Sequence, residues 1–328
     1  MGHDQSMDPV LTGAEVGLDE VHAVASEAQR AMTKVIEGKD DVVRTSLTVL
    51  LAGGHLLVED VPGVGKTMLA KALARTVDST VHRIQFTPDL LPSDITGVSV
   101  FHQDTHTFEF RPGAVFANVV VGDEINRASP KTQSALLEAM EERQVTADGR
   151  TYPLPDPFLV MATQNPFEME GTYPLPEAQR DRFMARISMG YPDTAAELRM
   201  LANHGSGSPL ADLRPVTDAV KVAALIKAVE KLHASPALQQ YVVDLVAATR
   251  TSPHLRLGAS PRAGLQLLRA ARAHAALEER DHVLPDDVQH LVTTVLAHRV
   301  ILSGDAELSG ASVADVLDSI VASVPVPG

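Results

Sequence analysis

The 328-residue chain contains no cysteine and no tryptophan, and only 4% of its residues are aromatic. The absence of cysteine excludes disulfide bonds, thiolate metal ligands and cysteine nucleophiles. A core poor in aromatic side chains has to be built from Leu, Val, Ile and Ala, which suits parallel sheets and packed helices. The sequence also lacks an apolar run long enough to cross a bilayer. We therefore expect a cytoplasmic protein without membrane insertion.

Basic residues are also fewer than acidic ones. The chain has 28 Lys and Arg against 42 Asp and Glu, which gives a formal net charge of −14. Proteins with a general affinity for the phosphate backbone of DNA or RNA carry a basic surplus. The balance therefore disfavours a nucleic-acid partner, although it leaves room for a local basic patch.

Five short apolar runs follow two predicted amphipathic helices, at residues 15–36 and 42–51. The runs are continuous rather than alternating, which is typical of parallel strands buried on both faces. Helical segments separate them, and this alternation favours a doubly wound sheet. The predicted strands are residues 56–59, 82–86, 118–122, 158–163 and 186–190.

Two β-like segments, at residues 96–115 and 144–154, interrupt this rhythm and read as hairpins inserted into the α/β core. The second carries the turn signal Asp148-Gly149. After residue 192 the strands stop, and Ser or Asp caps start helices at 218, 235 and 260. We predict a disordered leader at residues 1–14, a five-stranded α/β domain at 15–192 and a small all-α domain at 193–328.

A glycine-rich turn joins the first predicted strand to a helix. Residues 59–67 read Glu-Asp-Val-Pro-Gly-Val-Gly-Lys-Thr. The backbone amides of such a turn cradle phosphates, while Lys66 reaches the β/γ-phosphates and Thr67 offers its hydroxyl to Mg²⁺. The usual pattern, G-x-x-x-x-G-K-[ST], has glycine where this chain has Asp60. We expect a triphosphate site from which the Asp60 carboxylate turns away.

Two later strands end in polar residues that suit nucleotide hydrolysis. The strand at 119–122 leads into Asp123 and Glu124, and another ends just before Asn165. Adjacent strand residues point to opposite faces, so we assign Asp123 to the metal and Glu124 to the attacking water. Asn165 lies where the carboxyl ends of the strands meet, and we expect its amide to contact the water or the γ-phosphate. A turn-forming Asn before Pro is the structural alternative.

Two arginines are candidates for contact with a phosphate. Arg182 lies just before the fifth strand, where it could act as an arginine finger across a subunit boundary. The alternative is a surface pair with Asp181 or Glu177. Arg262 stands in the first turn of a helix, where a cation opposes the helix dipole unless an anion lies nearby. That anion could be a nucleotide phosphate.

Together these segments resemble the MoxR family of AAA+ ATPases, from Val35 to about His298. The combination of motifs carries the resemblance, since the phosphate loop alone is unspecific. The motifs are VIEG at residues 35–38, EDVPGVGKT at 59–67, QFTPDLLPSDITG at 85–97, GDEINRA at 122–128, ATQNP at 162–166, LPEAQ at 175–179 and GASPRA at 258–263.

The resemblance implies ATP and Mg²⁺ as cofactors and a helical lid after the α/β domain. It makes Asp60 a usual family residue, Asn165 sensor 1, Arg182 the arginine finger and Arg262 sensor 2, and it leaves open whether Arg180 reaches across instead. Catalysis would involve Lys66, Glu124, Asn165 and Arg182, and the metal would contact Thr67 and Asp123. The nucleotide would contact Ile36, Gly38, Val61, Pro62, Gly63, Val64, Gly65, Lys66, Thr67, Met68 and Arg262.

The resemblance also implies a hexameric ring that acts as a chaperone-like protein remodeller, with a partner that carries a von Willebrand factor A domain. Three alternatives stay open at this point: a motor subunit of a metal chelatase, a DNA-dependent motor, and a nucleotide-gated scaffold. A DNA motor needs basic hairpins. Here Arg143 and Arg150 flank the second hairpin, but Asp148 offsets them and the tip of the first is acidic.

Overall fold

A five-stranded parallel sheet forms the centre of the α/β domain, in the order β2-β5-β8-β1-β9. Each strand starts within one residue of its predicted position. β9 ends earlier than predicted, at Ile187; beyond it Ser188 Oγ and Gly190 N both donate to the Asp60 carboxylate. The strands are β1 (Leu56–Glu59), β2 (Val81–Gln85), β5 (Val119–Asp123), β8 (Leu159–Gln164) and β9 (Ala185–Ile187).

The computed structural model describes residues 17–61, 63–165, 171–192, 194, 197–198 and 209–327. The predicted leader at 1–14 and Pro62 lie outside these residues. So does residue 193, where the predicted domain boundary falls, and that boundary stays a prediction.

Helices cover both faces of the sheet at β1, β5 and β8, whose residues are almost all buried, as the continuous apolar runs predicted. The prediction is wrong for the edge strand β2, where only Ile84 is buried. Leu56 and Val58 of β1 belong to one hydrophobic cluster with α1 (Leu18–Thr33), α2 (Asp40–Leu51) and α3 (Lys66–Thr76). Leu57, which points the other way, belongs to a second cluster with α5 (Pro130–Glu142). Three short helical segments complete the domain: α4 (Pro92–Thr96), the 3₁₀ turn η1 (Ile125–Arg127) and α6 (Glu177–Arg180).

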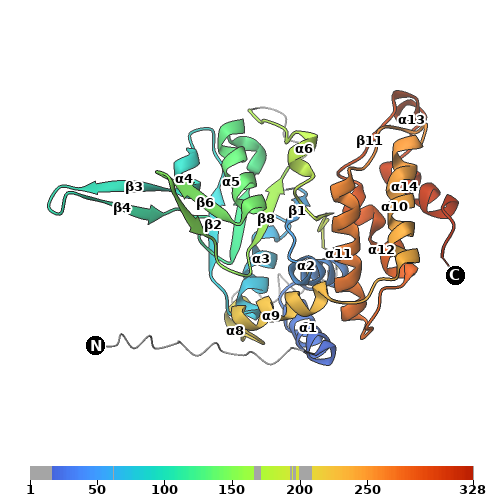
Figure 1. The fold of residues 1–328 in the computed structure, drawn as a ribbon, viewed down its shortest axis with the longest axis horizontal. Helices are drawn as coiled ribbons and strands as arrows, with labels where there is room; N and C mark the ends of the chain where they lie inside the picture. Colours follow the sequence, from blue (N-terminus) through green and yellow to red (C-terminus); the bar gives the residue numbers. More distant parts are fainter. Residues whose placement is uncertain are drawn as a thin grey trace, which may run out of the picture.

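Both predicted hairpins are present. β3 (Gly97–His102) pairs with β4 (Thr107–Pro112), and this hairpin projects from the domain on the side opposite the lid (Figure 1). β6 (Gln144–Ala147) pairs with β7 (Arg150–Pro153) through Asp148 and Gly149, both at positive φ, as a tight Asp-Gly turn requires.

The C-terminal third is a helical lid, but the prediction of an all-α lid was incomplete. β10 (Leu255–Leu257) and β11 (Ile301–Leu302) form an antiparallel pair, and strands this short have no detectable periodicity in the sequence. The helices after residue 208 are α8 (Pro209–Asp212), which contacts α3 of the α/β domain, α9 (Ala219–Glu230), α10 (Pro236–Thr251), α11 (Pro261–Leu277), α12 (Pro285–Leu296), α13 (Gly304–Leu308) and α14 (Val313–Ser323). None of the helices in the described part of the chain has the length and apolar character needed to cross a bilayer.

The lid rests on α1, α2 and β9 through α11 and α12 (Figure 1). A buried arginine fixes this junction. Arg299 is 4% exposed and donates to Asp181 Oδ1 at 2.8 Å and to the carbonyl oxygens of Phe183 and Met184. Burial lowers the pKa of Arg299 to about 10, and Asp181 opposes that shift, so the guanidinium stays charged at neutral pH. The lid is therefore bonded to the segment that leads into β9.

Candidate nucleotide-binding site

The phosphate loop has the geometry that its sequence predicts. It leaves the carboxyl end of β1, and α3 begins directly at Lys66. Gly63 and Gly65 have φ of 85° and 94°, a region that L side chains rarely adopt. A Cβ at Gly63 would meet no atom within 4 Å, so the backbone conformation, rather than lack of room, requires glycine there. The first turn of α3 contains no acidic residue that would repel an anion.

Asp60, which departs from the usual phosphate-loop pattern, directs its carboxylate towards the end of β9. Its carboxylate accepts hydrogen bonds from Gly190 N at 2.6 Å, Val61 N at 2.8 Å and Ser188 Oγ at 2.9 Å. Burial alone would raise the pKa of Asp60, but these hydrogen bonds outweigh it and the pKa lies below its ordinary value. The expected reorientation of this side chain is confirmed, and its role is to tie the loop to the end of β9.

Lys66 lies over the same loop, where its Nζ donates to Asp60 O at 2.8 Å. Partial burial lowers the pKa of Lys66, and the negative charges of Asp60, Asp123 and Glu124 oppose that shift. The ammonium thus binds the backbone of the loop and feels the charges of three carboxylates. A polyphosphate that enters this position gains a cation that is already partly desolvated.

Thr67 and Asp123 are brought together, as the sequence predicts. Thr67 Oγ1 donates to Asp123 Oδ2 at 3.2 Å, and Thr163 Oγ1 donates to Asp123 Oδ1 at 3.3 Å. Arg83 Nε, on β2, also contacts Asp123 Oδ2 at 2.6 Å. The hydroxyl and the carboxylate are the oxygen ligands that Mg²⁺ prefers. This pair lies at the amino terminus of α3, where the phosphate loop ends.

Glu124 occupies a left-handed backbone conformation, with φ of 58° and ψ of 50°. Its amide donates to Thr163 Oγ1 at 3.0 Å. Its carboxylate accepts from Gln85 Nε2 at 2.8 Å and contacts Arg127 Nη1 at 3.3 Å. The Glu124 carboxylate is therefore held by Gln85 and Arg127, and Gln85 in turn accepts from Arg83, which contacts Asp123.

Asn165 and the segment after α1 adjoin this site. Asn165 directly follows β8, the strand between β5 and β1, so it lies between the acidic pair and the phosphate loop. Ile36 is buried at 5% exposure, and Gly38 has a φ of 70°. Lys39 Nζ donates to Tyr191 O at 2.9 Å, which ties this segment to the same end of β9 that binds Asp60.

Comparison with known proteins agrees with this geometry. Residues 55–185 match the ATPase family associated with various cellular activities (AAA), and residues 247–320 match the AAA lid domain. The chain is 44% identical to chaperone MoxR1 of Mycobacterium tuberculosis, over 96% of this chain and 85% of the relative. It is 33% identical to protein MoxR of Methylorubrum extorquens, over 92% and 95% of the two chains.

The chain belongs to the MoxR family of AAA ATPases. A crystal structure from Cytophaga hutchinsonii agrees with this assignment, with a TM-score of 0.87 and 40% identity over 95% of this chain and 97% of the other. The chain is also 48% identical to the uncharacterised protein YeaC of Bacillus subtilis, over 94% and 97% of the two chains. Membership of the family makes this protein an ATPase and implies that it binds ATP.

The two candidate arginines of this MoxR-family protein lie together, but away from the phosphate loop. Arg182 Nε contacts Glu141 Oε2 at 3.0 Å, and Arg262 Nη1 contacts Glu141 Oε1 at 2.7 Å. The sequence allowed a second interpretation of Arg182, a surface ion pair with Asp181 or Glu177. In the structure Arg299 and Ser260 bind Asp181, and Arg180 binds Glu177 instead.

Glu141 lies at the amino-terminal edge of the sheet. Its neighbour Met140 binds His55 Nε2 through its carbonyl at 3.1 Å, and His55 immediately precedes β1. Met184 N donates to His55 O at 2.8 Å, which places the Arg182 segment at the same edge. The phosphate loop is at the other end of β1, a strand of four residues that spans about 13 Å.

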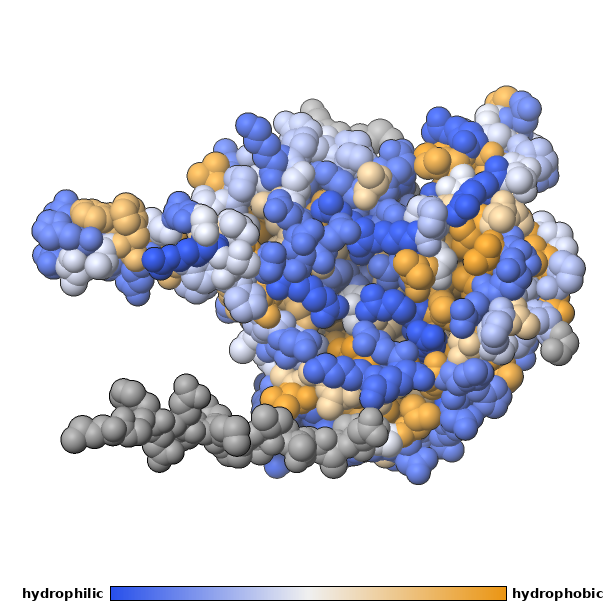
Figure 2. Space-filling model, in the orientation of Figure 1, coloured by the Kyte–Doolittle hydropathy of each residue, from blue (hydrophilic) through white to orange (hydrophobic). Residues whose placement is uncertain are grey.

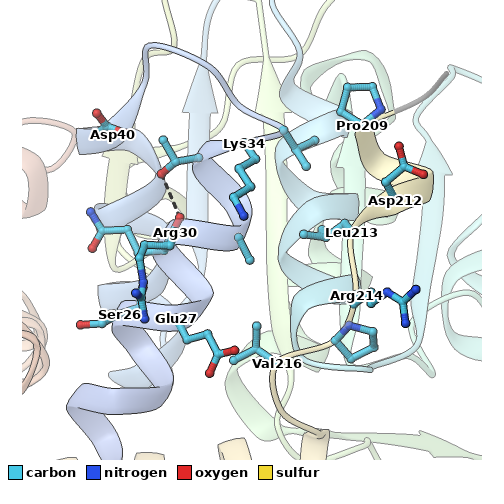
Figure 3. Close-up of a pocket in the computed structure, with 15 residues that line it drawn as sticks. Ser26, Glu27, Arg30, Lys34, Asp40, Pro209, Asp212, Leu213, Arg214 and Val216 are labelled. Carbon is cyan, nitrogen blue, oxygen red and sulfur yellow. Dashed lines mark hydrogen bonds between the residues drawn. The ribbon is translucent and has the colours of Figure 1, made fainter. Parts of the chain in front are cut away.

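A groove of about 1290 Å³ lies between α1 and residues 209–216 (Figure 3). Side chains of both signs line it, among them Glu27, Arg30 and Arg214. One end reaches Val35, next to the segment that the family resemblance places against adenine, but no residue of the phosphate loop lines it. The groove is therefore not the triphosphate site.

Four further residues contact the acidic pair and were given no role from the sequence: Gln85, Arg83, Thr163 and Arg127. Gln85 lies next to the last residue of a predicted strand (82–86), and in the structure it is in register with Asp123 on the neighbouring strand. Arg83 and Thr163 lie inside strands, where no local pattern separates a side chain at the site from one on the sheet. Their contacts follow from the strand order.

Proposed function

We propose that this protein hydrolyses ATP with Mg²⁺ at the loop after β1. The contact between Thr67 Oγ1 and Asp123 Oδ2 carries the proposal, because residues 56 positions apart meet beside a phosphate-binding helix terminus. Among the described residues no group of three or more His, Asp or Glu side chains could hold a metal by itself. A Mg²⁺ ion held by one carboxylate, one hydroxyl, nucleotide phosphates and water fits that donor set.

The roles of the residues follow from their positions. The amides of residues 63–66 and the Lys66 ammonium bind and orient the β- and γ-phosphates. Thr67 and Asp123 hold the metal, which supplies charge neutralisation on the phosphates when bound. Glu124 orients the attacking water as a general base, and Asn165, beside it, positions that water against the γ-phosphate.

We further propose that Arg182 and Arg262 act in trans. Both side chains lie at the amino-terminal edge of the sheet, with the length of β1 between them and their own phosphate loop. They can reach a nucleotide only if that edge faces the phosphate loop of another subunit. A homo-oligomeric ring, which the family resemblance implies to be a hexamer, provides that arrangement.

The proposed cellular role is chaperone-like protein remodelling in the cytoplasm, with a partner that carries a von Willebrand factor A domain. The name of the Mycobacterium tuberculosis relative, chaperone MoxR1, supports this role. The projecting hairpin supports it too. Phe101 and Phe108 are 46% and 69% exposed there, and residues 98–110 contain no Lys or Arg. Figure 2 shows hydrophobic residues near the end of this arm. An arm with two exposed aromatic side chains and no basic residue at its end suits a protein client better than a nucleic acid.

Two substitutions test the ATPase proposal. Lys66→Ala should weaken binding of Mg-ATP by about tenfold or more in calorimetry and abolish phosphate release, because it removes the charge at the β/γ-phosphates. Glu124→Gln should keep nucleotide binding and lose turnover. Lys71→Ala, an exposed lysine of the same helix, is the matched control. Normal binding and turnover in both site variants would refute the proposed site.

A further inference from the structure

Glu141 holds the two arginines on one carboxylate, and its position is unfavourable by local physics. It lies in the last turn of α5, which contains no basic residue, and a negative charge there opposes the helix dipole. Arg262 lies in the first turn of α11, which contains no acidic residue, and a positive charge there opposes the dipole in the same way. Each of these charges therefore costs about 0.3–1 kcal/mol at its own helix end.

The contact offsets this cost but does not explain why the charges are there. The side chains of Glu141, Arg182 and Arg262 are 35%, 29% and 35% exposed, and ion pairs at such positions contribute little to stability. Neutral residues at both helix ends would remove the dipole penalty. A placement that breaks a local rule without gain in stability indicates a functional requirement.

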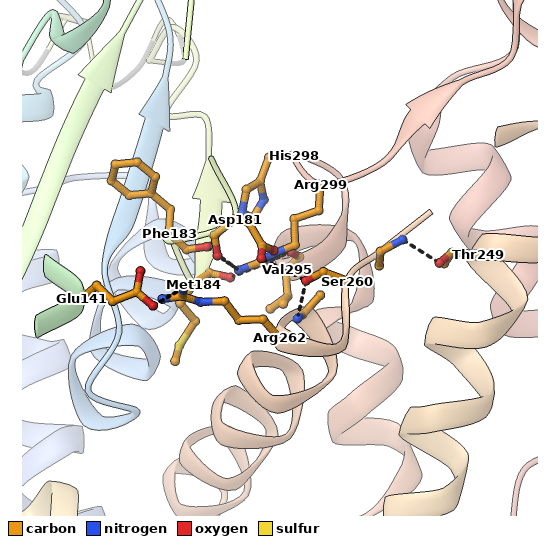
Figure 4. A network of polar contacts seen from close by, with 12 residues as sticks. Glu141, Asp181, Phe183, Met184, Thr249, Ser260, Arg262, Val295, His298 and Arg299 are labelled. Atoms are coloured by element: carbon orange, nitrogen blue, oxygen red, sulfur yellow. Dashed lines mark hydrogen bonds and ion pairs between the residues drawn. The ribbon is translucent and has the colours of Figure 1, made fainter. Parts of the chain in front are cut away.

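The surrounding contacts hold the backbone on either side of Arg182 and at the start of the Arg262 helix. Glu141 binds the two side chains. Asp181, before Arg182, accepts from Ser260 Oγ at 2.9 Å, and Ser260 caps the helix that carries Arg262. Phe183, after Arg182, binds Arg299 and His298 of the lid through its carbonyl oxygen (Figure 4). The core arginine and the lid arginine are thus presented from one rigid junction.

We infer that Glu141 is a positioning residue, which holds Arg182 of the core and Arg262 of the lid together for a single phosphate on a neighbouring subunit. Two guanidinium groups repel each other at close range, and one carboxylate between them lowers that repulsion. The group keeps a net charge of +1, so it still attracts a polyphosphate. The inference rests on the proposed function, because it needs a nucleotide supplied by another subunit.

The test is Glu141→Gln in the full-length protein, with Glu142→Gln as the matched control on the next residue of the same helix. Glu141→Gln should lower kcat by about ten- to a hundredfold, as expected for misplaced transition-state groups, with KM, ATP affinity and Tm unchanged. Glu142→Gln should behave as the wild type. A Glu141→Gln variant with wild-type or raised kcat would overturn the inference, and so would one that loses nucleotide affinity.

Two further measurements separate positioning from a structural effect. In the Arg182→Ala/Arg262→Ala background, Glu141→Gln should cause no further loss of kcat, because Glu141 acts through these two side chains. A mixture of Glu141→Gln and Lys66→Ala subunits should exceed the mean activity of the separate variants, because each supplies the half-site that the other lacks. An additive loss, or a mixture at or below the mean, would contradict the inference.

The two proposals fail differently. If Lys66→Ala turns over ATP like the wild type, the proposed function is wrong whatever Glu141→Gln does. If Lys66→Ala is inactive while Glu141→Gln matches Glu142→Gln, the ATPase site stands and only the role of Glu141 is wrong.

Discussion

At the scale of single residues, hydrogen bonds between distant segments hold the charged and polar groups of this protein in place. Asp60 replaces a glycine of the usual phosphate loop, and its carboxylate joins that loop to Ser188 and Gly190. His55 has the same kind of role at the opposite edge. Its Nδ1 accepts from Val160 N at 3.0 Å, and its Nε2 donates to Met140 O at 3.1 Å. This pattern requires a neutral imidazole.

His55 gives a prediction about pH. Burial lowers its pKa from 6.5 to about 3, so the native ring stays neutral while the unfolded chain takes up a proton. The free energy of unfolding should therefore fall as pH drops from 6.5 towards 3, by about 1.4 kcal/mol per unit from this residue. His55→Gln, which can still donate to Met140, should show a slope smaller by about that amount in urea denaturation at several pH values. Equal slopes would show that His55 does not titrate as stated.

At the scale of elements, the β3–β4 hairpin differs from the rest of the domain. Its strands pair with each other alone, and Phe101 and Phe108 lie side by side on it with ring centroids 5.1 Å apart. Phe side chains are usually buried in a folded protein. Their exposure at the end of a projecting arm favours contact with another protein.

The hairpin can be tested by Phe101→Ser/Phe108→Ser. Both side chains are already exposed, so Tm should change by no more than a few degrees and basal ATP turnover should stay within about twofold of the wild type. Stimulation of turnover by an unfolded protein such as reduced casein should be lost. Thr105→Ser at the polar tip is the control. Unchanged stimulation in the double variant would exclude the hairpin as the contact surface.

At the scale of the whole molecule, the candidate functional residues lie at two opposite ends of the parallel strands. The carboxyl-terminal edge carries the phosphate loop and the acidic pair, and the amino-terminal edge carries Arg182, Arg262 and Glu141. A single subunit cannot bring its two edges together, because the parallel sheet lies between them. Turnover should therefore depend on assembly.

This dependence gives a prediction for the arginines. Arg182→Ala should lower kcat by up to about 10³-fold with little change in ATP affinity, since removal of an arginine finger has effects of that size. Arg180→Ala is the comparison, because Arg180 pairs with Glu177 of its own helix at 3.7 Å and not with Glu141. Turnover per subunit should also rise with protein concentration in the wild type. A larger loss in Arg180→Ala would assign the finger to that residue instead.

Much of the candidate nucleotide site could be predicted from the sequence. Lys66, Thr67 and the loop glycines act through local backbone geometry, which a strand, a glycine-rich turn and a helix start specify within a dozen residues. Strand ends also locate Asp123, Glu124 and Asn165, because parallel strands bring their carboxyl ends to one edge. The short strands β10 and β11 could not be predicted, since two or three residues carry no period.

The sequence by itself determined the class of fold, the phosphate loop and the identity of the acidic pair, because each depends on short-range pattern and backbone geometry. Only the tertiary structure decided which charges meet. It turned Asp60 towards β9, placed Gln85 and Arg83 on the acidic pair, and joined Arg182 to Arg262 through Glu141. These contacts join residues 39 to 130 positions apart, so they depend on strand order and on the docking of the lid, which no local segment specifies.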